Sequence, residues 1–520
     1  MSTASLPLPA VDASKARPEA QAAVRQLWTT RILLVFCAIA GLFIVADFGV
    51  MLWGQNEFSQ PESIVAAQST MLARDGIFYN SLRDYPYTVN AYMPIFYLAD
   101  AALIRIGVPA FPAGRLISFA ALCGIYLLCW RILKLYTNDS KFATLTGTAL
   151  CISTSLLLSW GTVGQVDTLA VFFALTAFYQ YSRHRITQQP KALILAGLFA
   201  ILAVFTKQTM LAAPTAIFLC LLGERPRFEN WKAALGFGAC VVSVLGCGVL
   251  GWNLSTHGNF LFDTVFANMN PFLFEKLGPH WTYFSVFTGQ LVIVAVLCAR
   301  QTWRGHGKAL LVYLCLSAAM FLATAPKIGS DSNYQIEMTI LLVLCSGAGL
   351  EAMGFFKHLF AGSKTWITLL QLPLAIHMVQ NFRITVPFMI ARVVKENMFR
   401  EQVEAMKPYV PSAGRVISTD VNAMERLRGR LDVEPLIYTL LVHAERIDPK
   451  PLQKDLAAGA IPSVILYWDL SKKFDNDPEI PGLPEAQLDE IRQHYKLVKH
   501  IPGPYLDGVY IYQPSGAKPL

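Results

Sequence analysis

The chain has 520 residues, of which 54% are hydrophobic and 15% are charged, and its mean hydropathy is +0.42. A soluble protein of this length carries more charge, so the composition excludes an ordinary soluble enzyme and predicts a multi-pass membrane protein. The net charge of +8 comes from the first 387 residues, because residues 388–520 hold 17 basic and 18 acidic side chains. We therefore interpret the basic excess as a sign of membrane topology and not of nucleic-acid binding.

Apolar runs of the length that crosses a bilayer, roughly 20 residues, recur through the first 385 residues. Residues 1–30, which precede them, are predicted to form a loose cytoplasmic tail. With the N-terminus inside, the basic loops fall on the inner side, as the positive-inside rule requires. The sequence thus predicts a protein of the inner or plasma membrane with a cytoplasmic N-terminus and an extracytoplasmic C-terminal region. The eleven predicted transmembrane helices lie near residues 31–53, 113–133, 142–160, 165–182, 191–206, 208–223, 233–252, 282–299, 307–324, 335–353 and 365–383.

The first outer loop, residues 47–112, is unusually long for a connection between two membrane helices. Loops of this length are usually functional or disordered, and its many aromatic side chains argue against disorder. Residues 92–107 within it are apolar but short, and they include Asp100 and Arg105. Counting them as a span would place the later basic loops outside, so we expect a helix that lies in the membrane interface.

Residues 386–520 differ in composition and predict a small extracytoplasmic α/β domain beside the all-α membrane core of residues 31–385. The domain begins with an amphipathic helix that leaves the membrane. Residues 414–419 and 463–470 have strand composition, and residues 505–514 are typical of a hairpin. We find no phosphate-binding loop or nucleophile motif in this domain, so we expect the chemistry to lie in the membrane core.

Ionisable side chains gather at the predicted outer ends of helices and not in helix middles, where they would mark an ion pathway. Asp47 closes the first helix, Asp167 opens the fourth, and Lys207 joins the fifth and sixth. Each is explained singly by a solvated helix end or a snorkelling lysine, but their coincidence on one face predicts a polar pocket. The candidate catalytic residues are Glu62 and Asp47, and the candidate substrate-binding residues are Glu57, Arg83, Asp84, Tyr92, Asp167, Lys207, Gln208, Lys327, Asp331, Asn333, Tyr334 and Glu337.

Carboxylates and cations beside aromatic side chains suit the transfer of a sugar from a phosphate carrier. A carboxylate can take the proton of an acceptor hydroxyl or amine, and Lys and Arg can stabilise the charge of a departing phosphate. Because no nucleotide sugar is available outside the cell, the donor has to be linked to a lipid. The residues therefore predict a glycosyltransferase that uses a polyprenyl-phosphate-linked sugar and an extracytoplasmic acceptor, which is a lipid, a glycan or a protein.

A series of short motifs resembles the GT-C superfamily of membrane glycosyltransferases, nearest the family-39-like enzymes and the lipopolysaccharide galacturonosyltransferase type. The resemblance implies a helical membrane core, juxtamembrane helices in the first outer loop, and sugar transfer with inversion. It also implies that Lys207 and Lys327 hold the donor phosphate and that Asn333 and Tyr334 bind substrate. The motifs, within residues 31–385, are QPESIVAAQSTMLARDGIFY, YTVNAYMPIFYLADAALIRIG, GRLISF, GQVDTLAVFF, FTKQTMLAAPTA and GSDSNYQIEM.

The resemblance further implies that a carboxylate of the first outer loop acts as the catalytic base. Glu62 matches that position best, with Asp47 or Glu57 as substitutes. Family members often show an adjacent Asp-Glu pair, whereas this chain has Pro61 before Glu62, which leaves the choice of base open. Some GT-C enzymes need a divalent metal. Glu62 and Asp167 could supply ligands, but we expect that no metal or other cofactor is required.

Two other functions compete with the enzyme. A transporter or a flippase for lipid-linked glycans would also be multi-pass and basic, and a non-catalytic assembly protein could use the C-terminal domain to dock partners. The charge-poor helix middles, the missing internal repeat and the long first outer loop argue against transport. Release of polyprenyl phosphate from a lipid-linked sugar would distinguish the enzyme from both alternatives.

Overall fold

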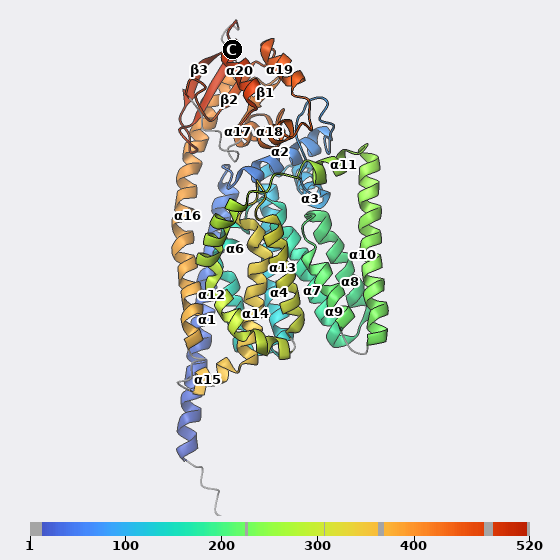
Figure 1. Cartoon of the computed structure of the whole chain (residues 1–520). Coiled ribbons are helices and arrows are strands. Elements are labelled where there is room, and N and C mark those ends of the chain that lie inside the picture. The colour runs from blue at the N-terminus through green and yellow to red at the C-terminus, as the bar shows by residue number, and fades with distance from the viewer. Residues whose placement is uncertain (1–12, 224–226, 306, 362–368, 473–481, 517–520) are drawn as a thin grey trace, which may run out of the picture.

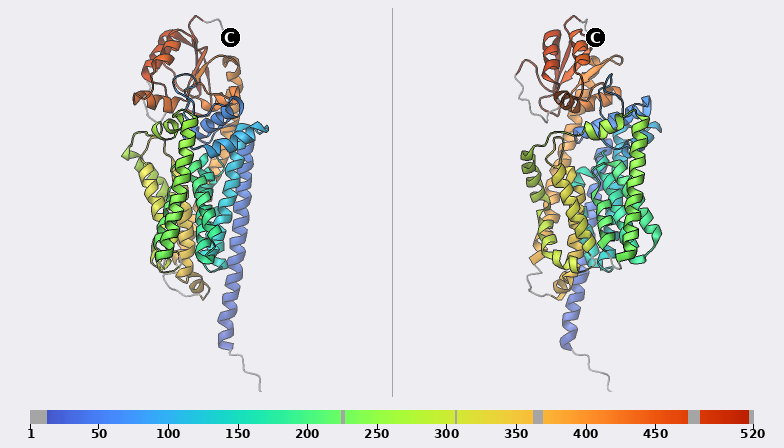
Figure 2. Two further views of the ribbon diagram at one scale, coloured as in Figure 1. Left: turned by 90° about the vertical axis from the view of Figure 1, so that its right-hand side faces the viewer. Right: turned by 45° about the vertical axis from the view of Figure 1, so that its right-hand side comes forward.

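The structure is a computed structural model that describes residues 13–223, 227–305, 307–361, 369–472 and 482–516. A bundle of helices forms the larger part, and a small α/β domain lies on one end of it (Figure 1). Helix α1 (Ala13–Trp53) extends beyond the opposite end, as the two turned views also show (Figure 2). The start of α1 and the α/β domain therefore lie at opposite faces of the bundle. Which face is cytoplasmic remains a prediction.

Each predicted apolar run overlaps a helix of the bundle, although residues 365–368 of the last run lie outside the described residues. By length and composition, six of the described helices could cross a membrane, and four shorter apolar helices accompany them. The predicted number of eleven spans stays a prediction. Besides α1, the bundle contains α4 (Ala110–Tyr136), α5 (Lys141–Ile152), α6 (Ser155–Trp160), α7 (Val166–Thr187), α8 (Pro190–Thr206), α9 (Ala212–Gly223), α10 (Arg227–Ser255), α12 (Leu277–Arg304), α13 (Lys308–Thr324), α14 (Ile336–Ala352), α15 (Phe355–Ala361) and α16 (Gln371–Met406).

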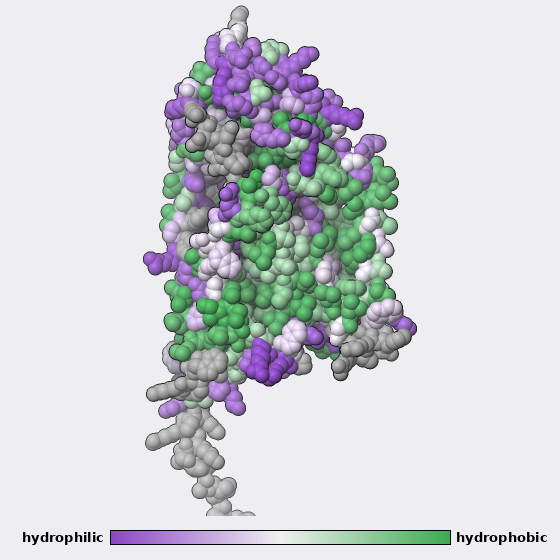
Figure 3. Space-filling model, viewed as in Figure 1, coloured by the Kyte–Doolittle hydropathy of each residue, from purple (hydrophilic) through white to green (hydrophobic). Residues whose placement is uncertain are grey.

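Burial differs strongly between the bundle helices. In the most apolar stretch of 18 residues within Ser332–Ala352, which contains α14, 89% of the residues are buried. In the corresponding stretch of α10, within Trp231–Ser255, only 17% are buried. Helix α14 packs against α12, α13 and α5 and forms the centre of the bundle. Large apolar side chains cover the outer surface, and Figure 3 shows them as a broad hydrophobic band below the polar α/β domain. Such a band suits contact with lipid, so the chain is a multi-pass membrane protein.

Two helices are longer than the sequence predicted. Helix α1 begins at Ala13, so the predicted loose tail is wrong for residues 13–30, and residues 1–12 lie outside the described residues. Helix α16 has 36 residues, about 54 Å at 1.5 Å per residue. It passes without a break across the predicted boundary at residue 386, although Pro387 removes one backbone donor from its interior. A single rigid element therefore joins the bundle to the α/β domain.

The first outer loop contains two helices, α2 (Gln60–Asp75) and α3 (Pro94–Arg105). Both begin with a proline in the first turn, where a missing N–H costs nothing, and α2 ends at Gly76 with a φ of 70°. They pack on each other at the upper end of the bundle, beneath the α/β domain (Figure 1). The 12 residues of α3, about 18 Å, are too short to cross a bilayer, in line with the expectation of an interfacial helix.

The α/β domain contains a four-stranded sheet in the order β1-β2-β4-β3. Strands β1 and β2 are parallel, and β4 runs antiparallel to both β2 and β3. The prediction of a small α/β domain is confirmed. The predicted hairpin within residues 505–514 is wrong, because these residues supply only the connection and β4, while β3 precedes them. The elements are β1 (Val416–Ser418), α17 (Val421–Arg428), α18 (Pro435–His443), α19 (Lys450–Ala457), β2 (Ser463–Leu466), α20 (Glu485–His494), β3 (Tyr495–Ile501) and β4 (Val509–Pro514).

The α/β domain and the first outer loop share one hydrophobic core. Ala67 and Met71 of α2 belong to the same buried cluster as the strands of the domain. The backbone of Tyr87 also pairs with the domain, since its N–H donates to Asp432 O and its carbonyl accepts from Glu434 N, both at 2.9 Å. These contacts hold the domain directly above the loop that the sequence singled out.

Candidate active site

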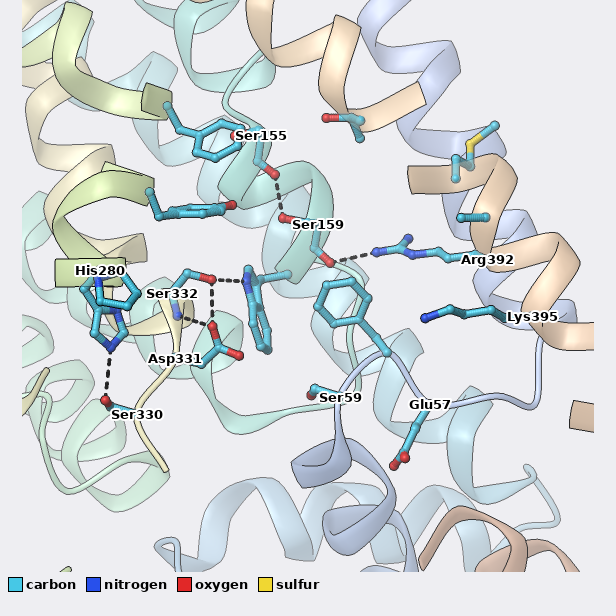
Figure 4. A pocket seen from close by; sticks show the side chains of 18 of the residues that line it. Glu57, Ser59, Ser155, Ser159, His280, Ser330, Asp331, Ser332, Arg392 and Lys395 are labelled. Carbon is cyan, nitrogen blue, oxygen red and sulfur yellow. Dashed lines mark hydrogen bonds between the residues drawn. The ribbon is translucent and has the colours of Figure 1, made fainter. Parts of the chain in front are cut away.

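A cavity of about 1020 Å³ opens at the upper end of the bundle between α6, α12 and α16. The segment 54–59, which links α1 to α2, and Tyr505 from the α/β domain complete its lining. Aromatic and apolar side chains form part of the walls, among them Phe58, Trp160, Tyr283, Phe287 and Met389. Figure 4 shows the polar residues on two facing walls. The acidic and basic side chains that line the cavity are Asp47, Glu57, Glu275, Lys276, His280, Asp331, Arg392 and Lys395.

Asp47 and Arg392 form a fixed ion pair on the cavity wall. Nη1 of Arg392 donates to both carboxylate oxygens of Asp47, at 2.8 and 3.0 Å, and Nη2 donates to Ser159 O at 3.1 Å. The guanidinium also lies 4.7 Å from the centre of the Phe58 ring. Charge-assisted bonds of this kind hold the carboxylate in one orientation. Asp47 is therefore a carboxylate that can accept a proton in the cavity.

Glu57 has the opposite electrostatic character. Its carboxyl is buried and accepts a hydrogen bond from Ser63 Oγ. Burial raises the pKa of Glu57 to about 8, and the nearby carboxyls of Asp420 and Glu62 add to that rise. Glu57 is accordingly protonated at pH 7 and serves better as a neutral hydrogen-bond donor than as a base. Lys395 of α16 lines the same cavity (Figure 4).

The opposite wall carries a set of hydrogen-bonded polar side chains (Figure 4). Nε2 of His280 lies 3.1 Å from Ser330 Oγ, and Trp160 Nε1 donates to Ser332 Oγ at 2.9 Å. Asp331 accepts from the backbone N–H and the hydroxyl of Ser332, at 2.5 and 3.1 Å. These bonds fix hydroxyl and carboxylate oxygens at positions suited to sugar hydroxyl groups.

Glu62, which the sequence favoured as the base, does not line the cavity. Its Oε1 accepts from Arg115 Nε and Gly164 N, both at 2.8 Å, and its Oε2 accepts from Arg115 Nη2 at 3.0 Å and Phe58 N at 2.8 Å. Both side chains are fully buried. Burial alone would raise the pKa of Glu62, but the guanidinium and the hydrogen bonds outweigh it and lower that pKa. Four donors occupy this carboxylate, so it holds the structure in place and has no oxygen available for a substrate.

The Glu62 partner, Arg115, also fixes the end of α1. Its guanidinium donates to the carbonyl of Met51 and, at 2.8 Å, to the carbonyls of Gly54 and Asn56. Carbonyls at the C-terminal end of a helix lack partners within the helix, and Arg115 supplies them. The Glu62–Arg115 pair thus positions the segment that carries Glu57 into the cavity.

A second group of predicted residues meets in a buried cluster at the outer ends of α7, α8 and α14. Lys207 Nζ lies 2.5 Å from Asp167 Oδ1 and 4.0 Å from the centre of the Tyr334 ring. Asn333 Nδ2 donates to the other Asp167 oxygen at 3.1 Å. The structure therefore brings together four of the predicted residues, but they neutralise one another and do not line the cavity.

Two further predicted residues flank this cluster. Glu337 accepts from Tyr313 OH at 2.6 Å and from Ser317 Oγ at 3.0 Å. Lys327 is half-buried, and burial, followed by the charge of Lys207, lowers its pKa to about 8. Within the described part of the chain, no carboxylate lies at ion-pair distance from Lys327. An ammonium group in such surroundings is suited to an anion.

The remaining predicted residues lie farther from the cavity. Gln208 donates two hydrogen bonds of 3.0 Å to backbone carbonyls, one in the first outer loop and one in the segment after α10. Tyr92 lies beside Tyr334. Arg83 and Asp84 are exposed and line no part of the cavity. Of all the predicted site residues, Asp47, Glu57 and Asp331 are the ones that line it.

Residues 93–252 match the family model described as dolichyl-phosphate-mannose-protein mannosyltransferase. Among solved structures, the chain is similar to ArnT from Cupriavidus metallidurans bound to undecaprenyl phosphate, with a TM-score of 0.63 and 11% identity over 94% of this chain and 99% of that one. It is also similar to the oligosaccharyltransferase of Archaeoglobus fulgidus in the apo form, with a TM-score of 0.53 and 11% identity over 85% and 70% of the two chains. The chain has the GT-C fold. Comparison with curated protein sequences gives no match.

The predicted resemblance to GT-C enzymes is thereby confirmed. The solved structures support the fold, and the family model supports the predicted enzyme class, a glycosyltransferase.

Several cavity residues of the GT-C bundle were not singled out from the sequence. Arg392 and Lys395 belong to a stretch whose sequence predicts an amphipathic helix that leaves the membrane. Tyr505 belongs to the connection before β4. Asp47 and Arg392 are 345 positions apart in the sequence, so no local sequence pattern predicts that they form an ion pair. The one available signal was the cluster of basic residues on a helix predicted to leave the membrane beside the outer loop.

The two carboxylates that the sequence suggested as metal ligands have other partners in this GT-C fold. Glu62 pairs with Arg115, and Asp167 pairs with Lys207. Within the described ranges, no three side chains of His, Cys, Asp or Glu are grouped as a metal site would need. The residues present therefore do not fit a metal centre.

Proposed function

We propose that this GT-C protein transfers a sugar from a polyprenyl-phosphate donor to an extracytoplasmic acceptor inside the cavity, with inversion at the anomeric carbon. The observation that carries the proposal is the Asp47–Arg392 pair, which presents an oriented carboxylate in the same cavity as Lys395 and Lys276. A base and a set of cations are the two requirements for displacing a phosphate from a sugar.

The reaction follows from the roles of these groups. Asp47 takes the proton of an acceptor hydroxyl or amine while the acceptor atom attacks the anomeric carbon from the face opposite the phosphate. The bond between that carbon and the phosphate oxygen breaks, and the phosphate leaves with the electron pair. Lys395 and Lys276 stabilise its charge. A single displacement of this kind inverts the configuration of the sugar.

The cavity also has a wall suited to the lipid part of a donor. Tyr283 and Phe287 of α12 face the cavity together with Met389 of α16. Both helices continue into the apolar band of the bundle. A polyprenyl chain can lie along this wall while its phosphate reaches the cations, and the similar ArnT structure is of a protein bound to undecaprenyl phosphate.

The topology follows from the same proposal. We place the cavity and the α/β domain outside, the start of α1 in the cytoplasm, and the bundle in the inner or plasma membrane. Residues 31–385 then do not form the catalytic unit alone. Residues 386–520 supply part of the cavity, because Arg392, Lys395 and Tyr505 line it. We assign Asp47 the role of base and Glu62 a positioning role, and we assign substrate contacts to Glu57 and Asp331.

The test uses the purified protein in lipid nanodiscs with a polyprenyl-phosphate-linked sugar. We expect release of polyprenyl phosphate together with a glycosylated acceptor, which a transporter or flippase would not produce. A mass-spectrometric comparison of envelope glycans from cells with and without the gene would identify the sugar and the acceptor. Movement of the lipid-linked sugar across the membrane with its phosphate bond intact would overturn the proposal.

Donor binding should weaken above pH 8. Burial raises the pKa of Glu57 to about 8, so its carboxyl is neutral below that pH and negative above it, where it repels the donor phosphate. We expect the KM for the donor to rise severalfold between pH 7 and pH 9, and Glu57→Gln to remove most of this rise. Because the pKa of Lys327 is also lowered to about 8, Lys327→Arg serves as the control that keeps that cation charged. An unchanged pH profile in Glu57→Gln would contradict the assignment.

A further inference from the structure

The connection between β3 and β4, residues 502–508, reaches from the α/β domain to the cavity. Of the described residues that follow α16, Tyr505 alone lines the cavity. The connection is braced by its own contacts, since Tyr510 OH donates to Asp507 Oδ2 at 2.6 Å and His500 Nε2 lies 2.9 Å from Asp507 O. At Gly508, with a φ of 111°, a Cβ would lie 2.1 Å from Ile501 O. The connection is therefore a tight structure that holds Tyr505 in place.

Tyr505 makes two kinds of contact at the cavity. Its hydroxyl has a single hydrogen, which is shared between Asn56 Oδ1 at 3.1 Å and the carbonyl of Glu57 at 3.0 Å. Its ring lies under Lys395, whose Nζ is 5.2 Å from the ring centre. Burial raises the pKa of the Tyr505 hydroxyl, so the hydroxyl stays protonated and remains a donor at physiological pH. One side chain thus touches the loop wall and a cavity cation together.

The segment 54–59, which Tyr505 contacts, has no helix or strand of its own. It is held by side chains from other elements. Glu396 of α16 accepts from Gln55 N and Asn56 N, both at 2.7 Å, and Arg115 Nη2 donates to the carbonyl of Asn56 at 2.8 Å. Further bonds hold the segment, since Arg426 of α17 donates to Gln55 Oε1 and Phe58 N donates to Glu62 Oε2 at 2.8 Å. Tyr505 adds the contact with Asn56 and with the carbonyl of Glu57, in the middle of the segment.

We propose that Tyr505 is a positioning residue through which the α/β domain fixes the segment 54–59 and orients Lys395 at the cavity. The effect on catalysis rests on the proposed function, but the effect on the segment does not. The α/β domain then contributes a side chain that determines the shape of the cavity wall. A chain in which the β3–β4 connection is loosened should keep its fold and lose the defined wall of its cavity.

The experiment compares Tyr505→Phe, Tyr505→Ala and the matched control Leu506→Ala in the full chain in nanodiscs. Leu506 is the neighbouring residue, is 63% exposed and does not line the cavity. Amide hydrogen exchange of residues 55–59 should become about 10-fold faster in Tyr505→Phe, in keeping with the loss of the hydrogen bond that the hydroxyl shares between Asn56 and Glu57. The control and the exchange of β2 should stay unchanged. Unaltered exchange of residues 55–59 in both Tyr505 variants would overturn the proposal whether or not sugar transfer is detected.

Kinetics supply the second readout. We expect kcat to fall about 10-fold in Tyr505→Phe and about 100-fold in Tyr505→Ala, with the unfolding temperature unchanged. The substitution Lys395→Met should add its effect fully to that of Tyr505→Phe, which retains the ring, and only partly to that of Tyr505→Ala. Full additivity with both would refute the orienting of Lys395. Faster exchange in a protein whose wild type transfers no sugar would count against the proposed function and leave the positioning role supported.

Discussion

Replacement of Asp47 by Asn should lower the rate of sugar transfer by about 100- to 10,000-fold, the range typical of a general base. The amide cannot take a proton from the acceptor, although it fills the same space. Arg392, which now contacts Asp47 at 2.8 and 3.0 Å, would keep its bond to Ser159 O and lose its countercharge, so the pair would become net positive. The KM for the anionic donor should therefore stay equal or fall while kcat collapses. The measurement is the initial rate of polyprenyl phosphate release as a function of donor concentration.

Asp331→Asn is the matched control for this experiment, since Asp331 is a second carboxylate in the same cavity. Its oxygen is engaged by its neighbour Ser332, so we expect a change of less than about 10-fold, of the size of one lost hydrogen bond. A kcat of Asp47→Asn within threefold of the wild type would show that another group accepts the proton. A rise in the donor KM with an unchanged kcat would instead assign Asp47 to binding.

The bundle could be predicted well because its signal is local. Runs of apolar residues and the charges of short loops are read within about 20 positions of the chain. The expectation that α3 does not cross the membrane has the same basis, since only that choice keeps the basic loops on one side, and its length of 12 residues agrees with it. The start of α1 could not be predicted in the same way. Residues 13–30 are polar and rich in Ala, and no nearby partner or cap distinguishes a projecting helix from a loose tail.

The site was harder to predict because its residues meet through the fold. The sequence drew attention to Asp47 and to the loop that carries Glu57, both of which line the cavity, since acidic residues are unusual beside a membrane helix. It could not show that Glu62 is enclosed by Arg115 and two backbone N–H groups. Nor could it show that the cation opposite Asp47 comes from α16. A carboxylate that binds substrate and one that anchors a loop look alike until their partners are known.

The substitution Glu62→Gln tests this distinction directly, and we expect it to destabilise the protein by about 3–5 kcal/mol, the effect of breaking a buried ion pair. The guanidinium of Arg115 would remain buried without its countercharge. The new amide would also oppose a donor of its own to one of the N–H groups that now bind the carboxylate. We expect a lower unfolding temperature and lower abundance in the membrane, whereas the kcat of the folded fraction should stay within about 10-fold of the wild type.

The double variant Glu62→Leu with Arg115→Met supplies the control, because it removes both charges and replaces them with apolar side chains of similar volume. Such replacements of a buried pair are often neutral. The double variant should therefore be more stable than a protein that carries only Glu62→Leu or only Arg115→Met. It would still lack the bonds from Arg115 to the end of α1, and we expect the recovery to be incomplete for that reason. A Glu62→Gln protein with unchanged stability and abolished transfer would return Glu62 to the role of base and would make the ion pair with Arg115 a feature of the resting site.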